Sequence, residues 1–300
     1  MDKKIIIDCD NTFSIDDCDI DDGLAIIYTL AQENAEVLGI NTTFGNNKLE
    51  IVYSNTISFM KNIGYSHIPV YKGSEGSYRN NEAAKFLVEM ADKYNGELSI
   101  LATGSLTNLY HAWQIDNTFY KKTKNISLMG GITEPLIINN KILNELNFSC
   151  NHKAALNVLE HGKSIIIATG NTCLDGFFTK ERFNQLKEGN DFEKWLYQSC
   201  IYWFDKEKNS FGNDGIYIWD IVAAVALLNP YLFIENILYI TPDKEGIKKG
   251  LLLGKGEMRK VTIPKIKNRD EYIEHVYEQF KIFGENTNTN GVINKPVFPV

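Results

Sequence analysis

Aspartates crowd a short stretch directly behind an apolar segment at the start of the chain. Residues 5–7, all isoleucine, read as a buried strand. The aspartates that follow are Asp8, Asp10, Asp16, Asp17, Asp19, Asp21 and Asp22. Carboxylates at this density repel one another, so a fold keeps them together only if a positive charge compensates. A hard divalent cation prefers carboxylate oxygens as ligands, so the stretch predicts a metal site.

The rest of the chain alternates between short apolar strands and helical patterns. Strands are predicted at residues 4–7, 36–43, 69–71, 98–102, 126–129 and 164–168, and helices at 23–30, 81–94, 108–114 and 153–161. This alternation predicts an α/β fold with a mostly parallel central sheet flanked by helices. Such sheets bind ligands at the carboxyl ends of their strands, which is where Asp8 and Asp10 fall.

After residue 175 the pattern changes to an appended helical region. Residues 177–206 are predicted to be helical and rich in aromatic side chains, and a helix over 219–228 begins with Trp219 and Asp220. The Asn/Thr/Pro-rich end predicts an extended tail over residues 285–300. Neither an internal repeat nor a flexible linker interrupts the pattern, so we expect one domain over residues 1–300.

The charge and the cysteine content of the chain indicate which classes of binding partner to expect. The net charge is −7, from 31 basic and 38 acidic residues with no basic run, which argues against nucleic acid. No apolar run approaches the roughly 20 residues that cross a bilayer, so we expect no membrane partner. The five cysteines lack metal-site spacing, and Met1 to Lys4 leave no room for a signal peptide. We therefore expect a cytoplasmic protein with a small-molecule ligand.

Several short motifs follow the acidic start in a fixed order. They are TTFGN at 42–46, TGSLTN at 103–108, MGG at 129–131, ELNF at 145–148 and WD at 219–220, ahead of an Ala-rich helix and Asn229-Pro230. With Asp8-Cys9-Asp10 and Asp21-Asp22, this series resembles the calcium-dependent nucleoside hydrolases. The resemblance implies a Rossmann-like nucleoside hydrolase fold. It also implies an N-ribohydrolase that cleaves nucleosides to free base and ribose.

The resemblance also assigns roles at a calcium site. It implies that Asp10, Asp22, Asp220 and the backbone carbonyl of Thr103 are Ca²⁺ ligands. Asp10 would in addition act as the catalytic general base toward a water held by the ion. Asp8 would support the ligands from behind.

The substrate contacts follow from the same match. Those expected to bind substrate are Asp21, Asn46, Met129, Asn139, Glu145, Asn147 and Trp219. Asn140 is an equal candidate for the position given to Asn139. The nucleoside is the expected partner, and relatives are commonly homodimers or homotetramers.

Two departures from the family pattern stand out. Extra residues separate Asp10 from Asp21 and Asp22, which leaves Asp16 and Asp17 as a rival register and gives residues 11–20 no assigned role. The helix over 23–30 follows Asp21 and Asp22 directly, and this favours the later pair. Trp219 stands where many members carry a histidine that protonates the leaving base, and none of the five histidines falls at a matching position.

Trp219 cannot donate a proton to a departing base, but its indole can stack on one. This resembles the purine-preferring branch of the family, so purines are expected ahead of pyrimidines. Further aromatic candidates for the base pocket are Tyr78, Tyr202, Trp203, Phe204 and Tyr217.

Two alternative functions remain open at this point. Asp8-x-Asp10-x-Thr12 after an apolar strand also fits the nucleophile motif of haloacid-dehalogenase-like phosphatases, which use Mg²⁺. The second acidic pair that such a fold needs has no apolar strand before it. The other alternative is a catalytically inactive nucleoside-binding protein, which the loss of the histidine would permit.

Overall fold

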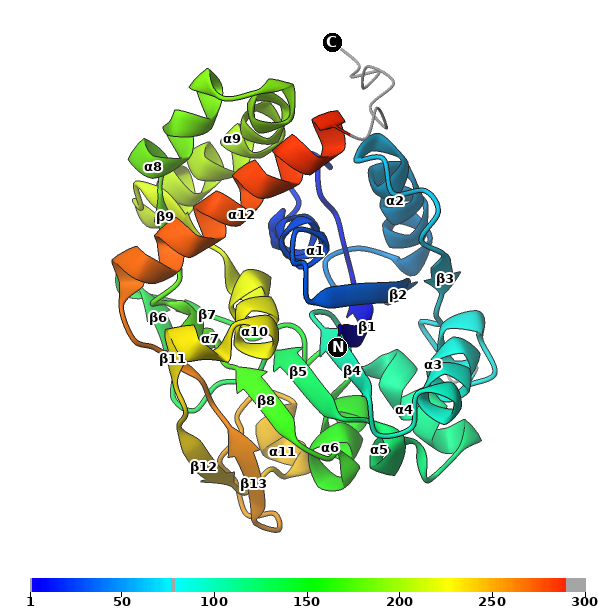
Figure 1. The fold of residues 1–300 in the computed structure, drawn as a ribbon. Coiled ribbons are helices and arrows are strands. Elements are labelled where there is room, and N and C mark those ends of the chain that lie inside the picture. The colour runs from blue at the N-terminus through cyan, green and yellow to red at the C-terminus, as the bar shows by residue number, and fades with distance from the viewer. Residues whose placement is uncertain (1, 77–78, 290–300) are drawn as a thin grey trace.

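A large sheet forms the centre of the computed structural model, which describes residues 2–76 and 79–289 (Figure 1). Tyr78 and residues 290–300 lie outside the described residues. The strands of the sheet are β1 (Lys3–Cys9), β2 (Ala35–Thr42), β3 (Val70–Lys72), β4 (Leu98–Ala102), β5 (Asn125–Met129), β8 (Ile165–Ala168), β12 (Ile237–Ile240) and β13 (Arg259–Thr262). Their order in space is β12-β13-β8-β5-β4-β1-β2-β3. All neighbours are parallel except β12 and β13, so the predicted α/β class is confirmed.

Helices cover both faces of this sheet (Figure 1). One layer consists of α1 (Asp21–Leu30), α2 (Leu49–Asn62), α10 (Trp219–Leu228) and α12 (Arg269–Thr289), and the other of α3 (Glu82–Lys93), α4 (Thr107–Ile115), α5 (Phe119–Lys122), α6 (His152–His161) and α11 (Lys244–Ile247). Side chains alternate along β1, so Ile5 and Ile7 enter the first core while Ile6 enters the second. The central strand therefore joins the two layers.

Helix α10 is the most deeply buried element of the first layer. From Asp220 to Leu228 every residue of WDIVAAVALL is buried, and the small alanines permit close packing on β5 and β8. Ser127 of β5 donates its hydroxyl to the Ala223 carbonyl at 2.8 Å. Because α1 packs beside α10, the N-terminal ends of the two helices meet at one edge of the sheet.

Residues 177–217 form the appended region, and they are not helical from the start. The predicted helix is wrong over β9 (Phe177–Thr179), which pairs antiparallel with β10 (Gly215–Tyr217). Between these strands lie α8 (Lys180–Asn184), a 3₁₀ turn (Gln185–Glu188) and the long helix α9 (Asp191–Phe211). Asn190 caps α9 through a capping box with Glu193, and Gly212 ends it with φ 75°.

The C-terminal helix corrects a second expectation. Helix α12 continues through Thr289, so an extended tail does not begin at residue 285. Gly284 and Thr287 are buried, and the Thr287 hydroxyl donates to the Phe283 carbonyl at 3.0 Å. Across the described ranges, no helix has both the length and the apolar character needed to cross a membrane.

The inserted residues 11–20 form a loop that is tied to α9. The Thr12 hydroxyl closes the loop by donating to the Asp19 carbonyl at 2.9 Å. The Tyr202 hydroxyl of α9 reaches the carbonyls of Ile15 and Cys18 at 3.1 and 3.0 Å, and Lys206 donates to the Asp17 carbonyl. The insertion and α9 therefore form one side of the molecule together.

We predict that Tyr202→Phe lowers the free energy of unfolding by about 1 kcal/mol, because the loop loses the hydroxyl that fixes it. Urea unfolding measures the change. Tyr197→Phe is the matched control, since within the described part of the chain the Tyr197 hydroxyl has no hydrogen bond. Equal losses in the two variants would contradict this role for Tyr202.

Candidate active site

The site lies where the chain changes direction across the sheet. From β1 the chain continues to β2 and β3 on one side, whereas β4 and β5 lie on the other. Loops diverge at such a switch point and leave a crevice beyond the strand ends. Asp10 follows β1, Asn46 follows β2, Thr103 follows β4 and Met129 ends β5.

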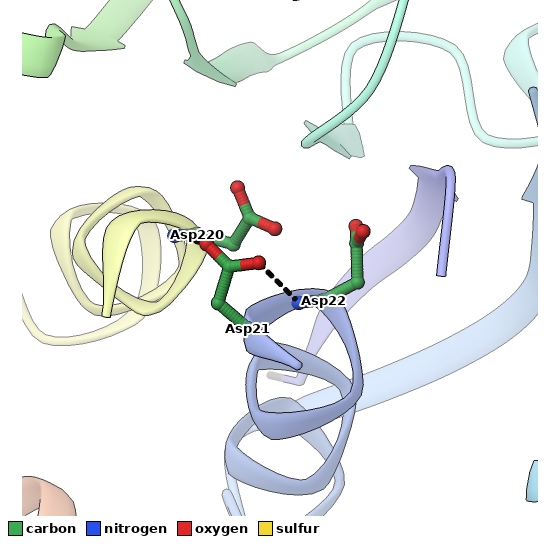
Figure 2. A group of neighbouring side chains, drawn as sticks. All are labelled: Asp21, Asp22 and Asp220. Carbon is green, nitrogen blue, oxygen red and sulfur yellow. Dashed lines mark hydrogen bonds between the residues drawn. The ribbon is translucent and has the colours of Figure 1, made fainter. Parts of the chain in front are cut away.

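Three carboxylates meet at the N-terminal ends of two helices (Figure 2). Asp21 and Asp22 begin α1, and Asp220 is the second residue of α10. One carboxylate oxygen of each lies within 4.8 Å of the others, and all three residues are buried. The backbone N–H of Asp220 donates to Asp21 Oδ2 at 3.3 Å and so joins the two helices. Helix N-terminal ends carry partial positive charge, which offsets part of the repulsion.

Asp10 brings a fourth carboxylate to this group from β1. Asp10 Oδ2 accepts from the Asn46 backbone N–H at 2.6 Å, whereas the buried Oδ1 has no hydrogen-bond partner in the described ranges. Asp22 Oδ1 accepts from the Thr103 hydroxyl at 2.7 Å, and Asn46 Nδ2 lies 3.4 Å from Asp22 Oδ2. Loops after β2 and β4 thus orient the acidic side chains.

Burial raises the pKa of all four carboxyl groups in this acidic group. Burial raises the pKa of Asp10 to about 6. Burial, and then the neighbouring carboxylates, raises the pKa of Asp21, Asp22 and Asp220 well above the usual range. Among the residues that the structure describes, no lysine or arginine forms an ion pair with these four.

The donor set fits a hard cation. Carboxylates of Asp10, Asp22 and Asp220 supply charged oxygens, and the free Oδ1 of Asp10 is available as a ligand. The Thr103 carbonyl accepts from Asn147 Nδ2 at 2.8 Å and has a second lone pair to offer. These oxygens come from well-separated chain segments, as a cation with several ligands requires.

Two glycines hold the Asp10 carboxyl in place. A Cβ atom on Gly45 would lie 2.0 Å from Asp10 Oδ2, and one on Gly104 would lie 2.9 Å from Oδ1. Gly45 belongs to the TTFGN motif and Gly104 to the TGSLTN motif, and neither motif by itself indicates this packing role. Only the fold shows that the loops after β2 and β4 close on the same carboxyl group.

A cavity of about 380 Å³ opens above the acidic group. Most predicted site residues line it, namely Asp21, Asn46, Thr103, Met129, Glu145, Asn147, Trp219 and Asp220. Asp10 and Asp22 lie behind Asn46 and Thr103, to which they are hydrogen-bonded. The wall also contains residues to which the sequence assigned no role in the site: Asp19, Leu136, Leu143, Asn144, Leu146, Gly170, Lys206, Glu207, Ser210 and Phe211.

Glu145 and Asn147 are held firmly by the backbone. Glu145 accepts hydrogen bonds from the N–H groups of Gly131, Phe148 and Ser149 at 3.1, 2.8 and 2.9 Å. Asn147 Nδ2 donates to the carbonyls of Thr103 and Met129, which leaves its Oδ1 without a protein partner in the described ranges. Asn147 thus offers the cavity an acceptor.

The structure places Asn139 away from this group. It occupies the turn between β6 (Leu136–Ile138) and β7 (Lys141–Leu143), where Asn139 and Asn140 have φ 46° and 64°. Its Nδ2 donates to the Phe211 carbonyl at 2.7 Å and to Asn213 Oδ1 at 2.9 Å. Asn144, directly before Glu145, lines the cavity instead.

The rival acidic pair also lies elsewhere. Asp16 and Asp17 are exposed on the insertion, whereas Asp21 and Asp22 are buried at the start of α1. The structure therefore favours the later register. Asp19, the last acid of the insertion, is partly buried and reaches the cavity.

The aromatic candidates separate into wall and core. Trp203 and Trp219 line the cavity, and the Tyr217 ring lies 5.1 Å from that of Trp219. Phe204 is buried in the core and Tyr202 holds the insertion. Trp219 is thus available to a ligand at the end of the cavity beside β10.

Asp8 lies outside the cavity. It is fully buried, accepts from Asn108 Nδ2 at 3.1 Å, and burial raises its pKa to about 7.

A mostly parallel sheet with an acidic cavity at its switch point is typical of an α/β enzyme with a small polar ligand. The family model "Inosine-uridine preferring nucleoside hydrolase" matches residues 5–274, so the chain belongs to this family. It is accordingly a nucleoside hydrolase. This finding favours neither of the alternatives, the haloacid-dehalogenase-like phosphatase or the inactive nucleoside-binding protein.

Relatives and solved structures agree with this family. Uridine nucleosidase 1 of Arabidopsis thaliana is 28% identical over 280 residues, 83% of this chain and 80% of that protein. Probable uridine nucleosidase 2 of Oryza sativa subsp. japonica is 26% identical over the same shares. The plant nucleoside hydrolase PpNRh1 superposes with a TM-score of 0.80 at 23% identity, covering 94% of this chain and 99% of that one. A purine-preferring ribonucleoside hydrolase from Gardnerella vaginalis gives 0.77 at 20% identity, covering 95% and 99%.

Gly45→Ala should displace the Asp10 carboxyl and so weaken cation binding and turnover, because the new Cβ would overlap Oδ2. Calorimetric titration with Ca²⁺ and an activity assay measure both effects. Gly76→Ala is the control, since a Cβ there meets no atom within 4 Å. Wild-type calcium affinity in Gly45→Ala would contradict the packing role.

Without a metal ion, stability should fall as pH rises. The unfolded aspartates titrate near pH 4, whereas burial raises the folded pKa of Asp10 to about 6 and raises that of Asp22 well above its usual range. Each carboxyl binds its proton more tightly when folded, so this stability is present at low pH and is lost as pH rises through the folded pKa.

Added Ca²⁺ should therefore raise the melting temperature more at pH 8 than at pH 5, because protons compete with the ion at the lower pH. At 100 times its dissociation constant the ion would add about 2.7 kcal/mol. Thermal melting in Ca²⁺ against EGTA measures the difference. If Ca²⁺ raised the melting temperature equally at both pH values, or not at all, the result would count against a metal on these carboxylates.

Proposed function

We propose that this nucleoside hydrolase cleaves ribonucleosides to free base and ribose with Ca²⁺ and Asp10, and prefers purines. The observation that carries the proposal is a group of four buried carboxylates without a protein cation, at the base of a cavity walled by Trp219. That combination suits a cation and a flat, uncharged ligand at the same time.

Asp10, Asp22, Asp220 and the Thr103 carbonyl would hold the ion. Bound there, Ca²⁺ would supply a Lewis acid that lowers the pKa of water and orients ribose hydroxyls. Asp10 accepts the proton of the attacking water as a general base. The Asn46 N–H fixes the Asp10 carboxyl through Oδ2 at 2.6 Å, and Oδ1, the oxygen also offered to the ion, has no protein partner in the described ranges.

The ribose meets the polar end of the cavity. Asp21 and the Asn147 Oδ1 accept hydrogen bonds from hydroxyl groups, while Asn46 offers an amide that donates as well. Glu145, fixed by three backbone N–H groups, adds a further acceptor. Such contacts hold the anomeric carbon in place while positive charge develops on the sugar.

The base meets the aromatic end. Stacking on the Trp219 indole favours the larger π surface of a purine. Curated relatives are named uridine nucleosidases and one solved structure is described as purine-preferring, so the two base classes are the natural comparison. A cytoplasmic location and a homodimeric or homotetrameric assembly are also proposed from the sequence.

Asp10→Ala should reduce turnover of inosine by a factor of about 10² to 10⁴ or more, because the water loses its proton acceptor. Release of reducing sugar measures the rate. Asp16→Ala is the matched control, as this exposed aspartate lies in the same segment outside the cavity. An active Asp10→Ala enzyme would refute the mechanism.

Trp219→Ala should lower kcat/KM for inosine, guanosine and adenosine roughly tenfold to hundredfold, the loss expected for one stacked base. The kcat/KM for uridine and cytidine should fall much less, because a pyrimidine covers less of the indole. Steady-state kinetics with all five nucleosides measures the effect. Equal losses for both classes would argue against stacking.

A further inference from the structure

The departing base needs a proton that the residues described so far do not supply. A base that leaves without protonation carries the electron pair of the broken bond as negative charge. The Trp219 indole N–H is too weak an acid to neutralise it. Among the described residues no histidine lines the cavity. His111 is hydrogen-bonded to Asn81 at 3.1 Å and His275 to the Tyr28 hydroxyl at 2.9 Å.

Most titratable groups of the cavity wall are already engaged. Asp21 and Asp220 belong to the acidic group, and three backbone N–H groups hold Glu145 as an acceptor. Lys206 donates to the Asp17 carbonyl and lies 4.5 Å from the Trp203 ring centroid. Asp19 is engaged as well, because its Oδ1 accepts from the Ile20 backbone N–H at 2.7 Å.

Glu207 differs from these groups in its surroundings. It projects from α9 into the cavity wall and is only 9% exposed. Its Oε2 has one long hydrogen bond, from Asn213 Nδ2 at 3.4 Å. Its Oε1 has no hydrogen-bond partner within residues 2–76 and 79–289. A nearly buried carboxyl group therefore has an oxygen available to a ligand.

Glu207 also lies at the aromatic end of the cavity. Tyr217 connects it to the stacking indole, because the Tyr217 and Trp219 rings are 5.1 Å apart. Glu207 and Trp219 line the same cavity, and the Glu207 charge, after burial, is among the causes that raise the pKa of the Tyr217 phenol. Trp203 and Phe211, from the same helix as Glu207, line the cavity beside it.

We propose that Glu207 is the acid that protonates the leaving base. The proposal rests on the proposed function. As the bond between the anomeric carbon and the base nitrogen breaks, its electron pair stays on the base. The Glu207 proton passes to a ring nitrogen of the base, such as N7 of a purine. Water adds hydroxide to the anomeric carbon and its proton goes to Asp10. Asp10 then releases this proton to solvent, and Glu207 regains one from solvent.

The charge state of Glu207 suits this transfer. Burial raises the pKa of its carboxyl to about 7, while Asn213 and Lys206 act in the opposite direction. The charged groups that face it are Asp19 from the insertion and Lys206 from α9, with Tyr217 from β10. A substantial fraction is therefore protonated near neutral pH, as general acid catalysis requires.

A comparison of two substrates distinguishes proton donation by Glu207 from a contribution of Glu207 to substrate binding. Inosine needs a protonated leaving group, whereas p-nitrophenyl β-D-ribofuranoside releases a stable phenolate without one. Glu207→Gln keeps the size and the Asn213 contact but has no acidic proton. It should lower kcat for inosine by a factor of about 10² to 10⁴ and leave kcat for the nitrophenyl riboside unchanged.

Asp205→Asn is the matched control on the same helix. Asp205 is 61% exposed and pairs with Lys180 at 2.7 Å, outside the cavity. This variant should cleave both substrates at the wild-type rate. A loss of inosine turnover in it equal to that of Glu207→Gln would overturn the proposal, since any charge removed from α9 would then have the same effect.

The wild-type enzyme gives a second test that needs no variant. Its kcat for inosine should fall as pH rises through about 7, because Glu207 loses its proton. The nitrophenyl riboside should lack this alkaline limb. The same limb on both substrates would overturn the proposal, as would equal losses on both in Glu207→Gln.

Failure of the proposed function gives a different result. A wild-type enzyme that cleaves neither inosine nor the nitrophenyl riboside in Ca²⁺ would overturn the proposed function and the role of Glu207 together. Wild-type cleavage of both, with Glu207→Gln fully active on inosine, would overturn the Glu207 proposal alone.

Discussion

The packing of α1 against α10 is the constraint on which the site depends. It brings two helix N-terminal ends together at the edge of the sheet and buries Asp21, Asp22 and Asp220 within reach of one another. The apolar sequence of α10 makes this burial unavoidable, because every residue after Trp219 is enclosed. The fold thus accepts a local electrostatic cost that a bound cation would offset.

The rest of the cavity comes from elements outside the sheet. The hairpin of β6 and β7 contributes Leu136 and Leu143, and α9 contributes Trp203 and Glu207. The insertion fixes itself to α9 through Tyr202 and adds Asp19. In the proposed function, the strand ends of the sheet would hold the sugar and the ion, while the outer elements would determine which base fits and how it leaves.

The sequence predicted most of the sheet and the acidic group, because both are encoded locally. Alternating apolar segments gave the strands, and the motifs placed Asp10, Asn46 and Thr103 at strand ends. Asn139 was misplaced relative to the cavity because a turn position depends on the hairpin around it. Glu207 could not be singled out, since on α9 only tertiary packing decides which polar residue enters the cavity. The start of the expected tail was misplaced for a similar reason, because packing on the core continues α12 through Thr289 despite weak helix formers.

A crystal structure of the protein with Ca²⁺ and ribose would show whether the acidic group binds a cation next to the sugar. We predict one ion bound by Asp10, Asp22, Asp220 and the Thr103 carbonyl, with Asp21 on the sugar hydroxyls. An ion bound at Asp16 and Asp17, or ribose bound with no ion near Asp10, would contradict it.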